Sequence, residues 1–379
     1  MRVAINGWFW DSPTTGSGQY TRRLVERLTA LDTDLQVSLV IPTEKEQEAK
    51  SKKQGAGGLR KVWFEQIAFP RTCARVGADV AHVPYWAPPF VPLVPTVVTI
   101  HDLIPLLLRE YRGRPLVRLY TALVSTTAHN AALVLTDSEA SRRDILAHLR
   151  LPAERVRVIP LAADGRYRPD PAPDDEAVRA RYGLSGQYVL YLGGFDIRKN
   201  VATALGTYRW AGPVIGKEYP LVIAGRLPEQ DTPLTPDPRR LAREQGIDER
   251  FVRFTGPVEE ADKPALYRGA AAFIFPSRYE GFGLPVLEAM ACGTPVVGSN
   301  VTSIPEVVGD AGVLLDADDA AGMAGAIIQL AHDPLLRAEL GRRAQARAAR
   351  FSWERTTRET LAAYRESRRA VEGALSGAK

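Results

Sequence analysis

The sequence is poor in cysteine and in long apolar runs, and both shortages exclude classes of protein. Only two cysteines, Cys73 and Cys292, occur in 379 residues, too few and too far apart for a disulfide framework or a zinc site. No stretch approaches the ~18 uncharged apolar residues of a membrane span. The first residues lack the apolar core of a signal peptide. We therefore expect a cytoplasmic protein, either free or attached to the inner face of a membrane.

The net charge is also small, at +5, and gives no indication of nucleic-acid binding. Its distribution along the chain is uneven. Residues 1–167 carry 22 Lys and Arg against 16 Asp and Glu, whereas the remainder carries 27 against 28. The positive excess therefore lies entirely in the N-terminal part of the chain.

The length and the order of the apolar segments predict two domains. Short apolar, β-branched runs alternate with helical patterns such as Thr21–Leu31, Ser138–Leu149 and Ala320–His332, which is typical of parallel α/β sheets. The proline-rich stretch Pro160–Asp175 divides the strands into two series, so we expect two Rossmann-like domains joined by a linker. The polar stretch Glu44–Gly58 is expected to be a surface loop. The predicted strands are Arg2–Asn6, Gln36–Ile41, Val80–Val83, Thr96–Ile100, Ala132–Thr136, Arg157–Ile159, Tyr188–Leu192, Leu221–Ala224, Val252–Thr255, Ala272–Phe275, Pro295–Gly298 and Gly312–Leu315.

The segment Pro276–Asn300 carries the richest pattern of chemistry-bearing residues. A predicted strand runs into a turn with Gly281 and Gly283, and a proline then suits the first turn of a helix. Glycine amides at a helix N-terminus favour a phosphate. Glu280 can face a ligand at the turn, and Glu288 can accept hydrogen bonds from a diol such as ribose. The alternative is a plain strand–turn–helix with two exposed carboxylates.

A second segment, Tyr191–Asn200, combines the end of a strand with a basic pair. The strand ends in two glycines, of which Gly194 is the second, and Arg198 and Lys199 follow. Loops at the carboxyl ends of parallel strands bind ligands in open α/β sheets, and these two cations suit a diphosphate. The alternative is a solvated basic turn.

A glycine loop, Thr14–Tyr20, lies between the first predicted strand and the first helix. Gly16 and Gly18 resemble the start of a dinucleotide fingerprint, but Thr21 stands where the third glycine would be. A nicotinamide dehydrogenase is therefore a weak alternative. The other interpretation is a glycine loop that lies beside a phosphate or a sugar.

A histidine directly follows the predicted strand Thr96–Ile100. His101 has Asp102 beside it at the carboxyl end of that strand, which makes it a candidate site residue. A packed or surface histidine is the alternative. His82 ends another strand and is the weaker candidate of the two.

With these pieces in order, the chain resembles the retaining glycosyltransferases of family four, group 1. The resemblance covers nearly the whole chain. It implies the GT-B fold, an α/β architecture of two Rossmann-like domains whose parallel sheets face each other across a cleft. An acceptor-side domain would span 1–167, a sugar-nucleotide domain 168–350, and a last helix within 351–379 would cross back to the first domain. The segments that carry the resemblance are TTGSGQYTRRL, THDLIP, TDSEASRRDI, VIPLAADGRYRP, YLGGFDIRKN, FTGPVEEADKPALYRGAAAFIFPS and EGFGLPVLEAMACGTPVVGSN.

The resemblance also implies roles for individual residues. Arg198 and Lys199 match the basic pair that binds the diphosphate, and Glu288 matches the carboxylate that binds the ribose. Glu280 matches the carboxylate that holds donor-sugar hydroxyls, and His101 matches the active-site histidine beside that sugar. The other positions that match donor-binding segments are Gly16, Gly18, Gly194 (an Arg in many relatives), Val258 near the base, and the turn Gly281, Phe282, Gly283 and Leu284.

The activity implied is transfer of a hexose, with mannose favoured, from a GDP- or UDP-linked sugar to a glycan or lipid-linked acceptor. The anomeric configuration would be retained. We expect no cofactor and no metal ion, because no acidic cluster is placed to hold one. The alternative is a sugar-nucleotide-binding protein of the same fold without transfer activity.

The stretch Ile104–Tyr120 mixes leucines, valine and tyrosines with Arg109, Arg112, Arg114 and Arg118. A basic amphipathic stretch can lie on an anionic membrane. The alternative, which we favour, is a pair of helices that pack on the core and expose a basic face to solvent.

Overall fold

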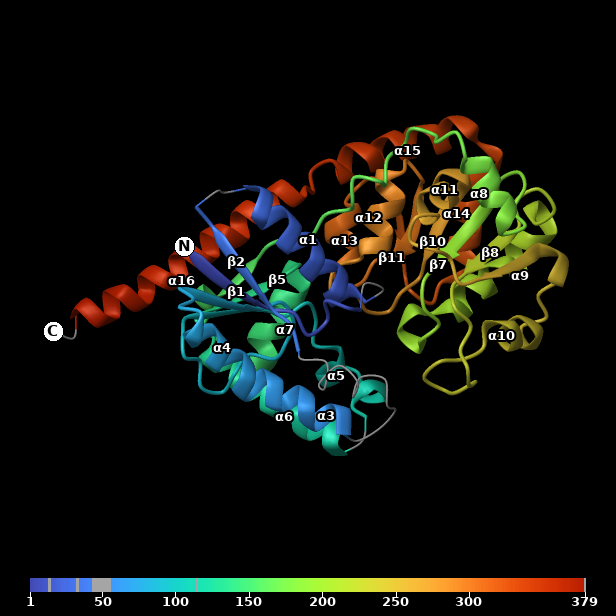
Figure 1. Ribbon diagram of the computed structural model, residues 1–379. Coiled ribbons are helices and arrows are strands. Elements are labelled where there is room, and N and C mark those ends of the chain that lie inside the picture. The colour runs from blue at the N-terminus through green and yellow to red at the C-terminus, as the bar shows by residue number, and fades with distance from the viewer. Residues whose placement is uncertain (13–14, 32–33, 43–55, 114, 378–379) are drawn as a thin grey trace. The chain divides into compact units, whose positions relative to one another are not determined.

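The computed structural model describes residues 1–12, 15–31, 34–42, 56–113 and 115–377, without the side chains of 56–58 and 371–377. Most of the predicted loop 44–58 and Arg114 therefore lie outside the described residues. The chain forms two compact units, one comprising Met1–Pro160 with Trp353–Lys379 and the other Leu161–Ser352 (Figure 1). The division falls at the start of the proline-rich stretch.

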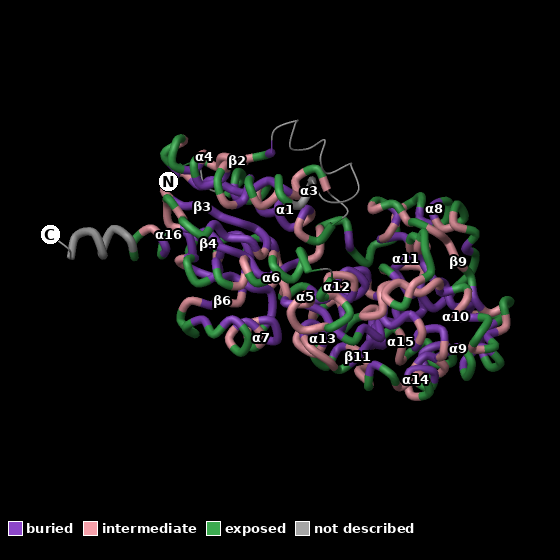
Figure 2. Tube along the Cα trace, turned by 90° about the horizontal axis from the view of Figure 1, so that it is seen from below, coloured by how far each residue is buried: buried purple, intermediate pink, exposed green. Residues whose placement is uncertain are grey.

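The first unit is built on a six-stranded parallel sheet in the order β2-β1-β3-β4-β5-β6. The four central strands are almost completely buried, as the purple segments of Figure 2 show. Because all the strands run in one direction, their carboxyl ends meet at a single edge. The strands are β1 (Arg2–Asn6), β2 (Gln36–Val40), β3 (Val80–Val83), β4 (Thr96–Thr99), β5 (Leu133–Thr136) and β6 (Val156–Val158).

Helices cover this sheet, and the last helix of the chain is one of them. Helix α1 buries Tyr20, Leu24 and Leu28 and packs against α16, which also contacts β3 and β4. The hydroxyl of Thr356 in α16 donates to the carbonyl of Pro160, 2.7 Å away. The helices of this unit are α1 (Gly16–Leu31), α3 (Ala56–Trp63), the π-helix η1 (Phe64–Ala68), α4 (Phe69–Arg75), α5 (Ile104–Leu107), α6 (Pro115–Thr127), α7 (Glu139–Leu149) and α16 (Trp353–Gly377), with short 3-10 turns at η2 (Arg109–Tyr111), η3 (Ala128–Asn130) and η4 (Ala153–Arg155).

The second unit repeats the architecture with a parallel sheet in the order β12-β11-β10-β7-β8-β9. The strands are β7 (Tyr188–Leu192), β8 (Leu221–Ala224), β9 (Val252–Gly256), β10 (Ala270–Phe275), β11 (Val296–Ser299) and β12 (Val313–Leu315). The helices are α8 (Asp175–Arg181), η5 (Ile197–Lys199), α9 (Val201–Ile215), α10 (Pro238–Glu244), η6 (Glu249–Phe251), α11 (Lys263–Gly269), α12 (Leu284–Ala291), α13 (Ile304–Val308), α14 (Ala320–His332) and α15 (Pro334–Ala348).

All twelve predicted strands are confirmed, with ends displaced by no more than two residues. The prediction succeeds because each strand is a short apolar run that is buried on both faces, which is what parallel sheets require. The predicted helix Ala320–His332 is confirmed at both ends, and Ser138 caps α7 by accepting from the amide of Ser141.

The expectation of a core-packed helix pair over Ile104–Tyr120 is wrong for α6. This helix buries Thr121, Val124 and Thr127, whereas Leu116 is 74% exposed and Leu119 68% exposed. The periodicity of the segment indicates that one face is apolar. It does not indicate whether another element covers that face.

Candidate functional site

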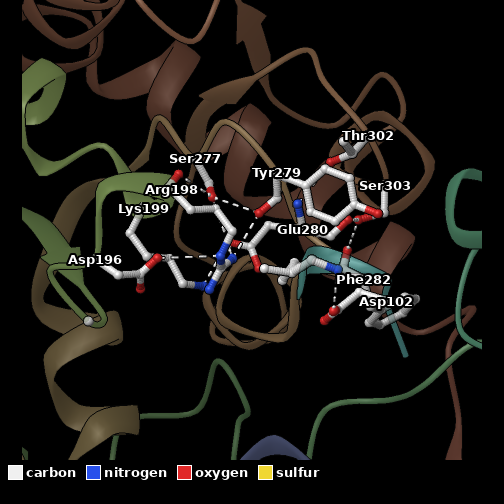
Figure 3. A network of polar contacts seen from close by, with 12 residues as sticks. Asp102, Asp196, Arg198, Lys199, Ser277, Tyr279, Glu280, Phe282, Thr302 and Ser303 are labelled. Carbon is white, nitrogen blue, oxygen red and sulfur yellow. Dashed lines mark hydrogen bonds and ion pairs between the residues drawn. The ribbon is translucent and has the colours of Figure 1, made fainter. Parts of the chain in front are cut away.

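In the second unit, three predicted site residues form one ion cluster (Figure 3). Strand β7 leads into the short turn η5, which carries Arg198 and Lys199, and neighbouring β10 leads to Ser277 and Glu280. Glu280 Oε1 lies 2.7 Å from Lys199 Nζ and 2.9 Å from Arg198 Nη1. The Ser277 hydroxyl donates to the same oxygen over 2.6 Å. The carboxylate and both cations thus share one small volume.

The turn that carries the cations is held by the backbone conformation of Asn200 and by hydrogen bonds to two other loops. Asn200 adopts a left-handed backbone conformation, which Asn tolerates better than most residues. Its side chain donates to the carbonyl of Ala317 over 2.7 Å. The Arg198 guanidinium also donates to the carbonyl of Tyr279 over 2.8 Å. These bonds hold the basic pair against the loop that carries Glu280.

Burial and the neighbouring cations have opposite effects on the pKa of Glu280. Burial acts to raise the pKa of this carboxyl, but the nearby Lys199 and Arg198 outweigh burial and hold the pKa below its usual range. Asp196 lies 3.4 Å from Arg198 Nε and adds a second negative charge. The formal charges of these four side chains therefore cancel.

The turn between Glu280 and α12 depends on glycine and on two hydroxyls. Gly283 has φ +107°, and a Cβ there would lie 2.8 Å from the side chain of Ile304. The Ser303 hydroxyl donates to the carbonyls of Glu280 and Phe282, and the amide of Glu280 donates to the hydroxyl of Thr302 over 3.0 Å. The predicted turn residues Gly281, Phe282, Gly283 and Leu284 are thereby placed at the N-terminus of α12, where the helix dipole favours an anion.

Both motif carboxylates are buried, so the alternative of two exposed carboxylates is wrong. Glu280 is 7% exposed and Glu288 8% exposed. The Tyr267 hydroxyl donates to Glu288 Oε2 over 3.1 Å. Burial raises the pKa of Glu288 to about 7, although Lys263 acts in the opposite direction.

Gly194 and Val258 lie on the loops after β7 and β9. The carbonyl of Gly194 accepts from the Tyr191 hydroxyl over 2.8 Å. A Cβ at Gly194 would meet only Asp196, at an ordinary 3.5 Å, so the local space does not demand glycine there. Val258 is half-buried.

In the first unit, His101 pairs with a carboxylate that the sequence analysis did not select. His101 follows β4, Asp137 follows the adjacent strand β5, and His101 Nδ1 lies 2.6 Å from Asp137 Oδ2. Burial acts to lower the pKa of His101, but Asp137 outweighs it and raises the pKa. The available signal was that Asp137 directly follows a predicted strand.

The two glycines of the loop before α1 differ in what surrounds them. A Cβ on Gly18 would lie 2.1 Å from the carbonyl oxygen of Ser12, whereas a Cβ on Gly16 would have no neighbour within 4 Å. The Thr15 hydroxyl accepts from the amide of Gly18 over 3.1 Å. Close packing of the backbone thus requires Gly18 but not Gly16. Thr14 lies outside the described residues.

Within the described ranges, no group of three or more His, Cys, Asp or Glu side chains is arranged to hold a metal ion. Among the helices of the described chain, none is long and apolar enough to cross a membrane.

Two family models match the chain, one in each unit. Residues 14–165 match the model described as Glycosyltransferase Family 4, and residues 186–333 match the model described as Glycosyl transferases group 1. O-antigen chain mannosyltransferase B from Escherichia coli is 35% identical over 373 residues, which cover 93% of this chain and 96% of that protein. The chain belongs to the family 4, group 1 glycosyltransferases.

One further relative matches part of the chain, and two solved structures match nearly all of it. D-inositol 3-phosphate glycosyltransferase of Acidothermus cellulolyticus is 34% identical over 243 residues, which are 62% of this chain and 53% of that protein. Among solved structures, sucrose-phosphate synthase from Thermosynechococcus elongatus has a TM-score of 0.72 at 24% identity and covers 97% of this chain and 98% of its own. Anabaena HepE in complex with UDP-glucose has a TM-score of 0.72 at 18% identity, over 96% and 100% of the two chains. These structures establish the GT-B fold.

Proposed function

We propose that this glycosyltransferase moves a mannosyl residue from a nucleoside diphosphate sugar to a glycan or lipid-linked acceptor and retains the anomeric configuration. The name of the full-length relative, an O-antigen chain mannosyltransferase, supports mannose. A complex of HepE with UDP and glucose supports a sugar nucleotide as the donor. The observation that carries the proposal is the cluster of Arg198, Lys199 and Glu280 beside the N-terminus of α12.

The proposed step breaks the bond between the anomeric carbon and the diphosphate oxygen and forms a bond from the acceptor oxygen to the same carbon. The acceptor proton passes to a diphosphate oxygen on the same face of the sugar, which accounts for retention. Negative charge grows on the diphosphate, and Arg198, Lys199 and the amides of α12 stabilise it electrostatically. We propose that these groups supply enough positive charge for the reaction to need no metal ion.

The carboxylates divide the recognition of the donor between them. Glu280 accepts hydrogen bonds from hydroxyls of the transferred sugar, and Glu288 accepts from the ribose diol. His101, which is oriented by Asp137, contacts the transferred sugar close to its anomeric carbon. Val258 lines the base, and Gly16 and Gly18 form the loop beside the phosphates.

The test is release of nucleoside diphosphate from GDP-mannose and, separately, from UDP-glucose in the presence of a polyprenyl-linked glycan. Release should persist with EDTA and should fall at least 100-fold in Glu280→Ala and Lys199→Ala. Arg250→Ala is the matched control, because Arg250 is exposed and its ion-pair partner Asp248 lies only two positions before it in the chain. If both site variants released nucleoside diphosphate as fast as wild type, the assignment of Glu280 and Lys199 to the site would be wrong. Tight nucleotide binding without turnover on any acceptor would favour the alternative, a binding protein without transfer activity.

We further propose that the first unit docks on an anionic membrane through a basic apolar face. This face consists of α3 with η1, the loop 90–93 and α6, and it collects large side chains that are at least 37% exposed: Leu59, Trp63, Ile67, Phe90, Val91, Leu93, Leu116, Val117 and Leu119. One hydrogen bond joins α3 to α6, since Lys61 Nζ donates to the Tyr120 hydroxyl over 3.0 Å. Gln66 links η1 to the loop 90–93, because its side-chain oxygen accepts a hydrogen bond from the amide of Phe90 over 2.7 Å. The exposed arginines of the face are Arg60 in α3 and Arg118 in α6, and the segments adjoining it in the chain add the exposed Arg71, Arg109 and Arg112.

Exposed apolar side chains among arginines are suited to the boundary between anionic headgroups and acyl chains. The chain should sediment with vesicles of anionic phospholipid but not with neutral ones, and high salt should release it. Leu116→Ser with Leu119→Ser should weaken binding several-fold, whereas Leu335→Ser, exposed in the other unit, should not. Equal binding to both lipids would contradict the docking face.

A further inference from the structure

A chain of buried polar contacts in the first unit runs from the C-terminal helix to the neighbourhood of His101. The Tyr364 hydroxyl in α16 lies 2.7 Å from His82 Nδ1 in β3. His82 Nε2 lies 2.8 Å from the Thr99 hydroxyl in β4, which lies 3.2 Å from the Tyr20 hydroxyl in α1. All four side chains are at most 4% exposed. Four elements thus meet through one continuous set of hydrogen bonds.

His82 connects the contacts on its two sides because it is neutral. Burial lowers the pKa of His82 to about 3, and the nearby His101 acts in the same direction, so the imidazole is neutral and carries one N–H. One ring nitrogen donates and the other accepts, so His82 bonds to Tyr364 through Nδ1 and to Thr99 through Nε2 at the same time. Each member is satisfied only while its neighbours stay in place.

The end of this chain contacts His101 through an aromatic ring. The Tyr20 ring packs edge-on against the His101 ring, with centroids 4.9 Å apart and planes at 85°. Asp137 fixes one atom of His101, Nδ1, at 2.6 Å. The backbone of Pro84 also acts on the imidazole. The Tyr20 ring restricts rotation of the imidazole from its own side.

We propose that Tyr20 is a positioning residue for His101, and that α16 holds Tyr20 in place through Tyr364, His82 and Thr99. The inference rests on the proposed function in one respect, since it takes His101 to face the donor sugar. Orientation of a group beside the reacting carbon affects the rate more than the binding of the donor. The C-terminal helix is therefore part of the catalytic apparatus as well as of the fold.

The experiment reads the orientation of His101 directly. The chain has five histidines, so ¹⁵N-histidine labelling gives few NMR signals, and the exposed His129, His148 and His332 serve as internal references. A short Nδ1–H···Asp137 bond should give a strongly downfield Nδ1 proton. The charged or titratable groups around His101 are Asp137, Asp102, His82 and Tyr20, so spectra are compared at one fixed pH.

Tyr20→Leu should lose the downfield signal and lower kcat roughly 10- to 100-fold, with the donor KM changed less than about twofold. Tyr20→Phe keeps the ring but loses the contact with Thr99, so it should keep more of the signal and of kcat than Tyr20→Leu and should resemble Tyr364→Phe. Tyr364→Phe should broaden the signal and lower kcat less. Tyr208→Phe, which removes a buried hydroxyl from the other unit, is the matched control. An intact signal and wild-type kcat in Tyr20→Leu would overturn the proposal.

The design separates this inference from the proposed function. If His101→Ala turns over like wild type while the signal still depends on Tyr20, His101 is positioned but does not take part in transfer. If His101→Ala abolishes transfer while Tyr20→Leu changes neither the signal nor kcat, the positioning role fails and the proposed function stands. Should Tyr20→Leu not fold, the comparison of Tyr364→Phe with Tyr208→Phe decides, since equal spectra and equal kcat in those two variants overturn it.

Discussion

At the scale of single residues, the cluster around Glu280 joins roles that the sequence assigns separately. The basic pair and the carboxylate that we propose binds the sugar come from motifs about 80 positions apart, yet Lys199 and Arg198 both contact Glu280 Oε1. Without a ligand, the two cations are already neutralised. A diphosphate must therefore compete with this carboxylate for them.

Glu280→Gln should consequently change binding and turnover in opposite directions. The amide keeps the shape and can still accept from Ser277, but it no longer neutralises Arg198 and Lys199. Nucleoside diphosphate should bind several-fold more tightly by titration calorimetry, while transfer should fall about 100-fold or more. Weaker binding together with slower transfer would indicate that Glu280 only supports the local structure.

Glu288 should make stability depend on pH. Its folded pKa is raised from 4.5 to about 7 by burial, so its contribution to stability is fully present below the unfolded pKa and is lost as pH rises through the folded value. The Gln side chain of Glu288→Gln cannot ionise, so this variant does not lose stability in that pH range. Its unfolding free energy relative to wild type should rise by about 3 kcal/mol between about pH 4 and about pH 8, as measured by urea denaturation. A difference that does not vary with pH would contradict the raised pKa.

The sequence locates the residues of the site but not all of their partners. Arg198, Lys199, Glu280 and Glu288 stand out because cations, glycines and carboxylates follow predicted strands. Asp137 does not stand out, because its contact with His101 depends on β4 and β5 being neighbours in the sheet, which no local pattern encodes.

At the scale of elements, the start of α1 offers a matched pair of glycines. Gly18→Ala should destabilise the first unit by at least about 2 kcal/mol, because the new Cβ would collide with the backbone oxygen of Ser12. Gly16→Ala should be nearly neutral, since nothing lies within 4 Å. Denaturation midpoints of the two variants measure the difference. Equal midpoints would mean that the segment before α1 moves aside without cost.

The elements themselves were largely predictable, and the reasons differ between strands and helices. A strand buried on both faces leaves a continuous apolar run whose ends are visible in the sequence. Helix α6 shows an apolar face in the sequence, but whether protein covers that face is decided by distant segments. Leu116 and Leu119 are exposed because no described element packs over them.

At the scale of the whole molecule, two units with separate cores should respond separately to ligand. The residues that we propose bind the diphosphate lie in the unit Leu161–Ser352, so GDP or UDP should raise the melting temperature of that unit. A chain that ends at Ser352 lacks α16 and its bonds to His82 and Pro160. It should lose the thermal transition of the first unit and keep nucleotide-dependent stabilisation of the second, as measured by calorimetry. Loss of both transitions would show that the units do not fold independently.

The place of α16 in the chain also bears on the order of folding during synthesis. The second unit is contiguous in the sequence and can fold as soon as it leaves the ribosome. The first unit needs residues made both first and last, and its Tyr364–His82 contact joins positions 282 apart. The part of its sheet that α16 contacts, β3 and β4, therefore stays uncovered, and the Tyr364–His82 bond stays unformed, until α16 has emerged. On the proposed function, a chain cut short before α16 would keep the residues that bind the nucleotide but lack the support that orients His101.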